Sequence, residues 1–150
     1  MTVEKIKALL DACYQAKRAR ELLPALPKGV TSSYIQYLDA IEQLEREGVR
    51  VKVSDISDAL HLPRPGVTRT VGEMEDKGYL QKSASAEDGR VTYLTINEQG
   101  RKLSQTFNEQ FFAQLAPLLD DISDEDAACT IRTIQALYDV MAERRITLVY

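Results

Sequence analysis

A proline-rich turn, PRPG at residues 63–66, separates two short helix-like segments and constrains the fold more than any other feature of the sequence. Before the turn, Ile56, Ala59 and Leu60 predict the inner face of a short helix. Ser54 is placed to cap the start of that helix. The sequence therefore predicts two helices joined by a tight turn.

The segment after the turn has an apolar stripe at helical spacing. Val67, Val71 and Met74 predict the buried face of a second helix, and Gly78 suits the residue just beyond its end. Such a stripe leaves the remaining faces of the helix free for other contacts. The polar and basic residues on those faces are Arg64, Thr68 and Arg69.

Residues 83–103, SASAEDGRVTYLTINEQGRKL, predict a β-hairpin followed by a helix. Gly89 tolerates the positive φ of a tight turn, and the Asp88 side chain can bond to its own backbone. Arg90 then lies at the exposed tip. At this point two explanations of Asp88 and Arg90 are open, ordinary turn chemistry and contact with a partner.

Two short helices, a tight turn and a hairpin, in this order, are typical of a winged helix-turn-helix. The residues LHLPRPGVTRTVGEMEDKGYL, followed by EDGRVTYLTINEQGR, resemble the MarR family of bacterial transcriptional regulators. The resemblance is specific over residues 54–102, where V-T-R, K-G-Y-L, D-x-R and I-N-E-Q-G keep that family's order and spacing. It implies a mainly α (α+β) fold, a winged helix-turn-helix with a small β-hairpin wing and a flanking helical dimerisation region.

For the whole chain, the resemblance implies a sequence-specific DNA-binding transcriptional regulator, expected to be a repressor. Residues 31–102 would form the DNA-binding domain of a single regulator chain, and residues 1–30 and 103–150 the helical dimerisation region. Such a homodimer places its two second helices in the major groove of a pseudo-palindromic operator, with each wing at an adjacent minor groove. A small-molecule or oxidant signal would release it, and the sequence does not name the effector.

The resemblance also implies roles for individual residues. Arg90 matches the wing arginine that enters the minor groove, and Asp88 matches the aspartate that holds its guanidinium in position. A guanidinium suits the negative potential of a narrow minor groove, and a carboxylate partner limits its rotamer freedom. Thr68 and Arg69 match the V-T-R motif, for which base edges and phosphate oxygens are both open as partners. The expected DNA-binding residues are Arg64, Pro65, Thr68, Arg69, Asp88 and Arg90.

The start of the second helix departs from the family pattern. The family commonly has a small polar residue at the position of Pro63, which can cap the helix. Here Pro63 and Pro65 bracket Arg64 instead, so the direction of the Arg64 side chain is left open.

Helical patterns also precede this region. The first stripe stops at PALPKG, where Pro24 and Pro27 break the helix, and Thr31 with the serines after it offers the next cap. Gly48 suits the end of the second helix, and VRVKV, residues 49–53, predicts an edge strand. The two stripes are Ile6, Leu9, Leu10, Cys13 and Ala16, and then Tyr34, Tyr37, Leu38, Ile41 and Leu44.

The C-terminal third predicts two more helices. Asn97 is a suitable cap for the first, Pro117 should kink or end it, and Ser123 with Asp126 offers a capping start for the last. Helices this apolar need partners, and an intertwined homodimer interface of about 2,000 Å² or more would cover them. The predicted stripes are Leu103, Phe107, Phe111, Leu115 and Leu119, and then a buried set of Ile131, Ile134, Tyr138 and Met141.

A net charge of −4 opposes binding to nucleic acid when it is taken over the whole chain, but binding depends on local charge. Residues 64–102 carry 7 Lys and Arg against 6 Asp and Glu, whereas residues 103–150 carry 3 against 8. The acidity therefore lies mostly in the C-terminal third, and the middle segment can present a cationic face. A winged helix that binds protein instead of DNA is the alternative function.

The sequence offers no constellation of catalytic residues. His61 is the single histidine and falls in the predicted turn, and no phosphate loop or metal spacing occurs, so we expect no enzyme activity, cofactor or metal. The absence of a long apolar run or signal peptide predicts a cytoplasmic protein without a membrane partner. Cys13 resembles the reactive cysteine of the family's peroxide-sensing branch, near Tyr14, so it is a candidate redox sensor; a buried structural cysteine is the alternative.

Overall fold

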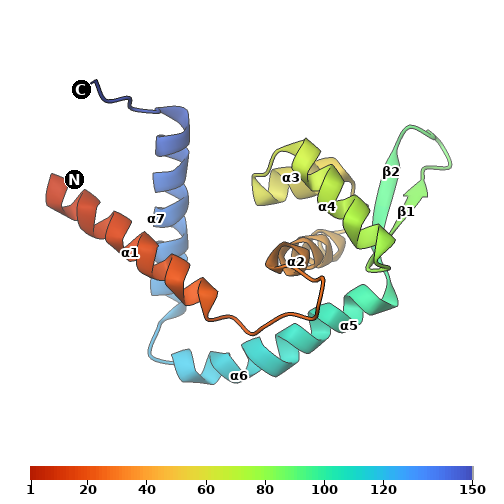
Figure 1. The fold of residues 1–150 in the computed structure, drawn as a ribbon, viewed down its shortest axis with the longest axis horizontal. Helices are drawn as coiled ribbons and strands as arrows, with labels where there is room; N and C mark the ends of the chain where they lie inside the picture. Colours follow the sequence, from red (N-terminus) through yellow and green to blue (C-terminus); the bar gives the residue numbers. More distant parts are fainter. Residues whose placement is uncertain (150) are drawn as a thin grey trace. The chain divides into compact units, whose positions relative to one another are not determined.

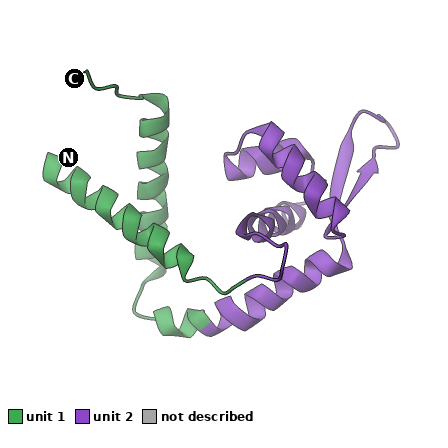
Figure 2. Cartoon of the chain, in the orientation of Figure 1, with its two compact units in different colours: residues 1–25, 115–150 green, residues 26–114 purple. Residues whose placement is uncertain are grey.

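The chain between residues 26 and 114 folds around the second helix of the protein, α2 (Ser32–Arg46). The computed structural model describes residues 1–149 of the chain. It divides them into two units, shown in Figure 2: Leu26–Gln114 is one, and Met1–Ala25 with the segment from Leu115 onward is the other.

The first of these units, Leu26–Gln114, is a winged helix-turn-helix, as the sequence predicts (Figure 1). Two helices joined by a tight turn are followed by a two-stranded antiparallel hairpin and a further helix. After α2 its elements are α3 (Val53–Leu60), α4 (Arg64–Asp76), β1 (Leu80–Ala84), β2 (Thr92–Ile96) and α5 (Glu98–Phe107).

The stripe predicted on the second motif helix forms the centre of the core. Val67, Val71 and Met74 of α4 are fully buried, with 0% of each residue exposed. They belong to one cluster with Leu38 and Ile41 of α2, which are equally buried. At about 25 cal/mol per Å² of apolar surface removed from water, this burial is a main contribution to holding α4 in the domain.

The inner face of α3 differs from the prediction at one position. Ile56 is buried as expected, but Ala59 is exposed, and Ser57 is buried in its place. The Ser57 hydroxyl donates a hydrogen bond of 2.5 Å to the carbonyl of Leu62, beyond the end of the helix. His61 takes the left-handed conformation, with φ of 52°, that ends α3 in the predicted turn. A polar side chain is therefore buried here because the turn offers it a partner.

The edge strand predicted at residues 49–53 is wrong. Val51 accepts a single backbone hydrogen bond from the N–H of Leu94, at 2.8 Å, and no strand forms there. Helix α3 already begins at Val53, because the Asp55 carboxylate accepts the backbone N–H of Lys52 at 2.8 Å and fixes the start of the helix. Val51 is nevertheless buried, so its apolar side chain belongs to the core although the segment forms no β-strand.

The hairpin pairs Leu80 with Ile96 at its base and Ala84 with Thr92 near its tip. Gly78 precedes it with φ of 79°, a conformation in which glycine avoids strain. Asn97 stands at the cap position of α5, as predicted, but its side chain is not bonded to the helix. It donates instead to the carbonyl of Leu80, at 3.1 Å, and so ties the base of the hairpin.

The helix predicted from Leu103 towards Pro117 is not uniform. After α5 the chain makes a π-helical turn over Asn108–Phe112, a short α6 (Ala113–Leu115) and a 3₁₀ turn over Ala116–Leu119. Pro117 lies in the first turn of that last segment, where the chain leaves the α-helical path as predicted. The predicted stripe from Leu103 to Leu119 therefore lies on a segment whose helical geometry changes along its length.

The other unit contains α1 (Val3–Glu21) and α7 (Asp124–Glu143). The predicted start of α7 is confirmed, because the Ser123 hydroxyl accepts the backbone N–H of Asp126 at 3.1 Å. The apolar stripe of α7, predicted to be buried, is exposed in the single chain over the described residues. The exposed fractions are 68% for Ile131, 39% for Ile134, 58% for Tyr138 and 54% for Met141. Every helix within residues 1–149 is too short or too polar to span a bilayer.

Gly100 gives a test of how tightly α5 packs on the base of the hairpin. A Cβ atom at this position would overlap the carbonyl oxygen of Tyr79 and lie 2.8 Å from Cγ2 of Ile96. We expect Gly100→Ala to lower the free energy of unfolding by about 1–3 kcal/mol or more, measured by urea denaturation.

The matched control for this substitution is Gly72→Ala in α4, where a Cβ atom would meet nothing within 4 Å. That variant should gain about 0.5–1 kcal/mol, because alanine restricts the unfolded chain more than glycine does. Equal denaturation midpoints for the two variants would show that α5 does not depend on this close approach.

Candidate nucleic-acid interface

Helix α4 begins without a side-chain cap. The carbonyl of Pro63 accepts the N–H groups of Gly66, at 3.1 Å, and Val67, at 3.2 Å. Pro65 is tolerated in this first turn, because the first amides of a helix have no intrahelical partner to lose. The two prolines that depart from the family pattern therefore start the helix at Arg64 and leave its exposed face intact.

The face of α4 opposite its buried stripe is free of internal contacts. Arg64, Pro65, Thr68 and Arg69 are all exposed. Within residues 1–149, none of these side chains forms a hydrogen bond or an ion pair. Two guanidinium groups and a hydroxyl are thus available as hydrogen-bond donors on one rigid helix. The sequence placed Thr68 and Arg69 correctly, because helical spacing assigns them to a face away from the core, whereas it left the direction of Arg64 open.

The C-terminal end of α4 is held by a lysine. The Lys77 ammonium donates to the carbonyl of Gly29, at 2.5 Å, and to the hydroxyl of Tyr34, at 3.0 Å. The hydrogen bond with Tyr34 raises the pKa of Lys77 above its usual value. Tyr34 in turn donates to the Glu73 carboxylate at 3.3 Å. Sequence reasoning missed this link, because the partners are separated by more than 35 residues.

An ion pair joins α4 to the wing. The Lys82 ammonium of β1 lies 2.8 Å from Oε2 of Glu75. The backbone N–H of Lys82 also donates to Oε1 of the same carboxylate, at 3.3 Å. Because the carboxylate accepts from Lys82 at both oxygens, the pKa of Glu75 lies below its usual value. The contact fixes the direction in which the hairpin leaves the helix.

The tip of the wing is organised by its own side chains. Oδ1 of Asp88 accepts the backbone N–H of Arg90 at 3.0 Å, and the Ser85 hydroxyl accepts the N–H of Asp88 at 3.3 Å. Arg90 is exposed, and no ion pair joins it to Asp88 in the part of the chain that the structure describes. The expectation that Asp88 holds the Arg90 guanidinium is therefore not what this structure contains; the carboxylate holds the loop backbone instead.

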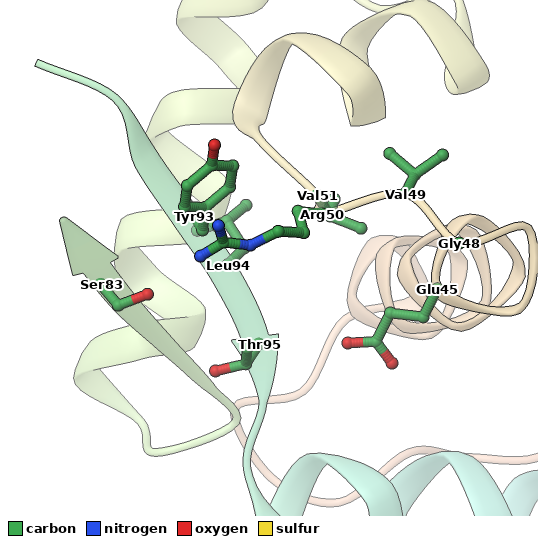
Figure 3. Close-up of a pocket in the computed structure, with 9 residues that line it drawn as sticks. All are labelled: Glu45, Gly48, Val49, Arg50, Val51, Ser83, Tyr93, Leu94 and Thr95. Atoms are coloured by element: carbon green, nitrogen blue, oxygen red, sulfur yellow. The ribbon is translucent and has the colours of Figure 1, made fainter. Parts of the chain in front are cut away.

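The outer face of the hairpin carries a pocket of about 280 Å³, shown in Figure 3. The guanidinium carbon of Arg50 lies 3.9 Å from the centre of the Tyr93 ring, and both residues line the pocket. Sequence reasoning missed this pair, because residues 49–53 were assigned to a strand. The alternation of β2, which turns Tyr93 and Thr95 away from the core, was the available signal.

The remaining candidate residues lie elsewhere. Cys13 is half-buried on α1, Cys129 is exposed on α7, and both thiols are free. His61 is alone in its turn, and residues 1–149 contain no group of three side chains that could hold a metal ion. The arrangement on α4 and the wing can therefore donate hydrogen bonds to an anionic surface, whereas the described part of the chain shows no assembled metal centre.

Comparison with known proteins agrees with this geometry. The model of the MarR family matches residues 28–91 of the chain. YdgJ of Bacillus subtilis (strain 168), an uncharacterized HTH-type transcriptional regulator, is 22% identical over 117 residues, which are 78% of this chain. The chain spans only 65% of the length of that relative.

Two solved structures have a similar fold. FabT of Streptococcus pneumoniae in complex with DNA matches with a TM-score of 0.65 and 21% identity over 95% of this chain and 99% of FabT. The PcaV transcriptional regulator of Streptomyces coelicolor, in complex with its natural ligand, matches with a TM-score of 0.66 and 18% identity. That match covers 85% of this chain and 89% of PcaV. At these identities the two structures support the fold.

The ion pair between α4 and the wing can be tested by titration. The lowered pKa of Glu75 means that its ion pair contributes stability above the pKa of an unfolded glutamate, and that the contribution is lost as pH falls through the lowered folded pKa. We expect Lys82→Met to raise the pKa of Glu75 towards 4.5, measured by NMR of the carboxyl carbon.

Lys102→Met is the control for this titration, because it removes the same charge from an exposed position on α5. It should leave the titration of Glu75 unchanged. If both variants shifted the pKa of Glu75 equally, the shift would come from the general charge of the domain and not from the ion pair.

Proposed function

We propose that the chain is a transcriptional regulator of the MarR type that binds double-stranded DNA in a sequence-specific manner, since the model of that family matches residues 28–91. It acts as a homodimer and a repressor on a pseudo-palindromic operator, in the cytoplasm and without catalytic activity. Residues 31–102 bind the DNA, and residues 1–30 and 103–150 form the dimer.

The exposed face of α4 carries this proposal. Thr68 and Arg69 have no hydrogen-bond or ion-pair partner within residues 1–149, and the buried stripe of the same helix fixes the direction in which they point. In a winged helix-turn-helix this helix enters the major groove. There a guanidinium can donate two hydrogen bonds to O6 and N7 of guanine, and a hydroxyl can contact a base edge or a phosphate. Arg64 and Pro65, at the start of the helix, lie beside the sugar-phosphate backbone of the DNA.

The wing supplies the second contact. Arg90 is exposed at its tip and enters the minor groove, where the negative potential attracts a guanidinium. Asp88 shapes the loop by holding the backbone N–H of Arg90, at 3.0 Å. Its carboxylate thus presents the arginine indirectly, by fixing the backbone from which the side chain extends.

The exposed apolar side chains of the terminal helices support a homodimer. α1 and α7 contain no buried residue in the single chain, although Leu10, Ile131 and Met141 are among the apolar residues that they expose. Burying such surface against a second copy is favourable at about 25 cal/mol per Å². A symmetric dimer also places two equal recognition helices on a palindrome.

A signal releases the DNA in this proposal, either a small molecule or an oxidant. The neighbouring PcaV structure holds its natural ligand, which favours a small molecule. Cys13, half-buried on α1, is the candidate for an oxidant. Binding of the small molecule, or oxidation of Cys13, lowers the affinity for DNA. Either event favours a dimer whose two winged domains no longer match the spacing of the operator half-sites.

DNA binding is tested with an operator that the protein itself selects from random duplexes. Arg69→Ala should weaken operator binding by about 1–3 kcal/mol for a lost base contact, and should weaken binding to random DNA much less. Affinities are measured by fluorescence anisotropy at fixed salt.

Arg46→Ala is the control, because it removes the same charge from an exposed position on α2. It should change both affinities little. A wild-type protein that selects no sequence, and whose weak binding is unaffected by either change, would exclude DNA recognition and leave protein binding as the function.

The dimer is tested by sedimentation. At micromolar concentration the wild type should have about twice the 16.9 kDa mass of the chain. Ile131→Glu places a charge on the exposed apolar stripe of α7 and should produce monomers, because burying an unpaired carboxylate is costly.

The control for this experiment is Ala136→Glu, about 140° around the same helix from Ile131. It should remain dimeric. A wild type that sediments as a monomer, or two variants that dissociate alike, would rule out this stripe as the interface.

A further inference from the structure

Arg50, in the segment between α2 and α3, places a cation against the outer face of the wing. Its guanidinium carbon lies 3.9 Å from the centre of the Tyr93 ring, a cation–π contact that restricts the side chain. The two ion pairs found within residues 1–149 are Lys82 with Glu75 and Arg101 with Glu45, so Arg50 has no carboxylate partner there. Stacking uses the face of the guanidinium and leaves its N–H donors at the edge free.

Two hydroxyl groups lie beside this guanidinium. Ser83 is the cross-strand partner of Tyr93, and Thr95 follows two residues along β2, so all three side chains leave the same face of the hairpin. Figure 3 shows them around the open pocket of about 280 Å³ that Arg50 also lines. An anion in this pocket would meet one charged donor and the neutral hydroxyl of Ser83, because the Thr95 hydroxyl donates to the carbonyl of Gln81, at 3.5 Å.

One acidic residue, Glu45 of α2, also lines the pocket and would oppose an anion. Its carboxylate is paired with Arg101 of α5, whose Nη2 lies 3.5 Å from Oε2. The pair reduces the negative potential at that end of the pocket. The side of the pocket formed by Arg50 and the hairpin is therefore the end suited to an anion.

The position of the pocket indicates which anion it binds. Tyr93 is three residues from Arg90, so at about 3.3 Å per residue the stacked guanidinium lies beside a point about 10 Å from the wing tip. The minor groove is about 6 Å wide and is bordered by the two phosphate backbones. A wing whose tip lies in that groove therefore brings this face next to a backbone.

We propose that Arg50, stacked on Tyr93 in a pocket that the Ser83 hydroxyl also lines, is a binding site for a phosphodiester group of the DNA backbone beside the wing. The inference rests on the proposed function, since it requires a bound duplex. A single guanidinium at an open surface pocket would bind a free phosphate weakly. It suits a phosphate of a duplex that α4 and the wing tip already hold in place. Such a contact positions the wing and carries no sequence information.

The salt dependence of binding tests this site. Each phosphate that a protein neutralises contributes about 0.9 to the slope of log K against log salt concentration. Arg50→Met should therefore lower the magnitude of the slope by about 0.9 and weaken binding to operator DNA and to random DNA by the same factor. Arg46→Met is the matched control: it removes the same charge from a pocket that Glu42 and Glu45 also line, and should leave the slope unchanged.

A second pair of variants tests the aromatic support without changing the charge. Tyr93→Phe keeps the ring under the guanidinium and should bind DNA like the wild type. Tyr93→Leu removes the ring and should weaken binding to operator DNA and to random DNA by a common factor. That factor should be smaller than the one for Arg50→Met. Near-ultraviolet circular dichroism and the denaturation midpoint check that each variant is folded.

The outcomes separate this inference from the proposed function. Wild-type protein without salt-dependent DNA binding would overturn both. Normal DNA binding by the wild type with an unchanged slope in Arg50→Met would overturn only the phosphate site. Inorganic phosphate at millimolar concentration could also bind at Arg50, which NMR of the arginine side chain would detect. Such binding, combined with an unchanged slope in Arg50→Met, would assign the pocket to a free anion and overturn the phosphodiester site.

Discussion

The burial of one apolar stripe of α4 in the common core is the constraint on which the rest of the winged domain depends. Val67, Val71 and Met74 enter the core together, and each is fully buried. Because these residues lie on one side of the helix, their burial also decides that Thr68 and Arg69 point away from the protein. The same apolar stripe that stabilises the domain thus orients the side chains that would read DNA, and a loss of several kcal/mol in the core would disturb both.

Polar contacts then fix what apolar packing leaves free. A stripe of aliphatic side chains tolerates small rotations, whereas the ion pair of Glu75 with Lys82 sets the angle between α4 and the wing. At the same end of the helix, Lys77 bonds to the carbonyl of Gly29 and so holds the segment that leads into α2. These surface contacts contribute little to stability individually, and their importance is geometric.

The two units of the chain differ in how they are stabilised. The winged unit has its own core and can bury its stripes internally, whereas α1 and α7 bury no residue in the single chain. Ser123 and Asp126 cap α7 well, but a cap of about 1 kcal/mol does not offset an uncovered apolar face. The unit that contains α1 and α7 is therefore the part of the described chain that gains least from apolar burial within the single chain.

The sequence by itself determined the winged motif. Helical spacing placed Val67 and Arg69 on opposite faces, and turn chemistry placed Arg90 at the tip, because both depend on residues close together in the chain. Only the tertiary structure decided which apolar residues are covered and which polar groups meet. Val51 serves the core instead of a strand, Asp88 binds a backbone amide instead of a guanidinium, and Arg50 stacks on Tyr93 more than 40 residues away. Such contacts depend on how distant segments pack, and local spacing carries no information about that.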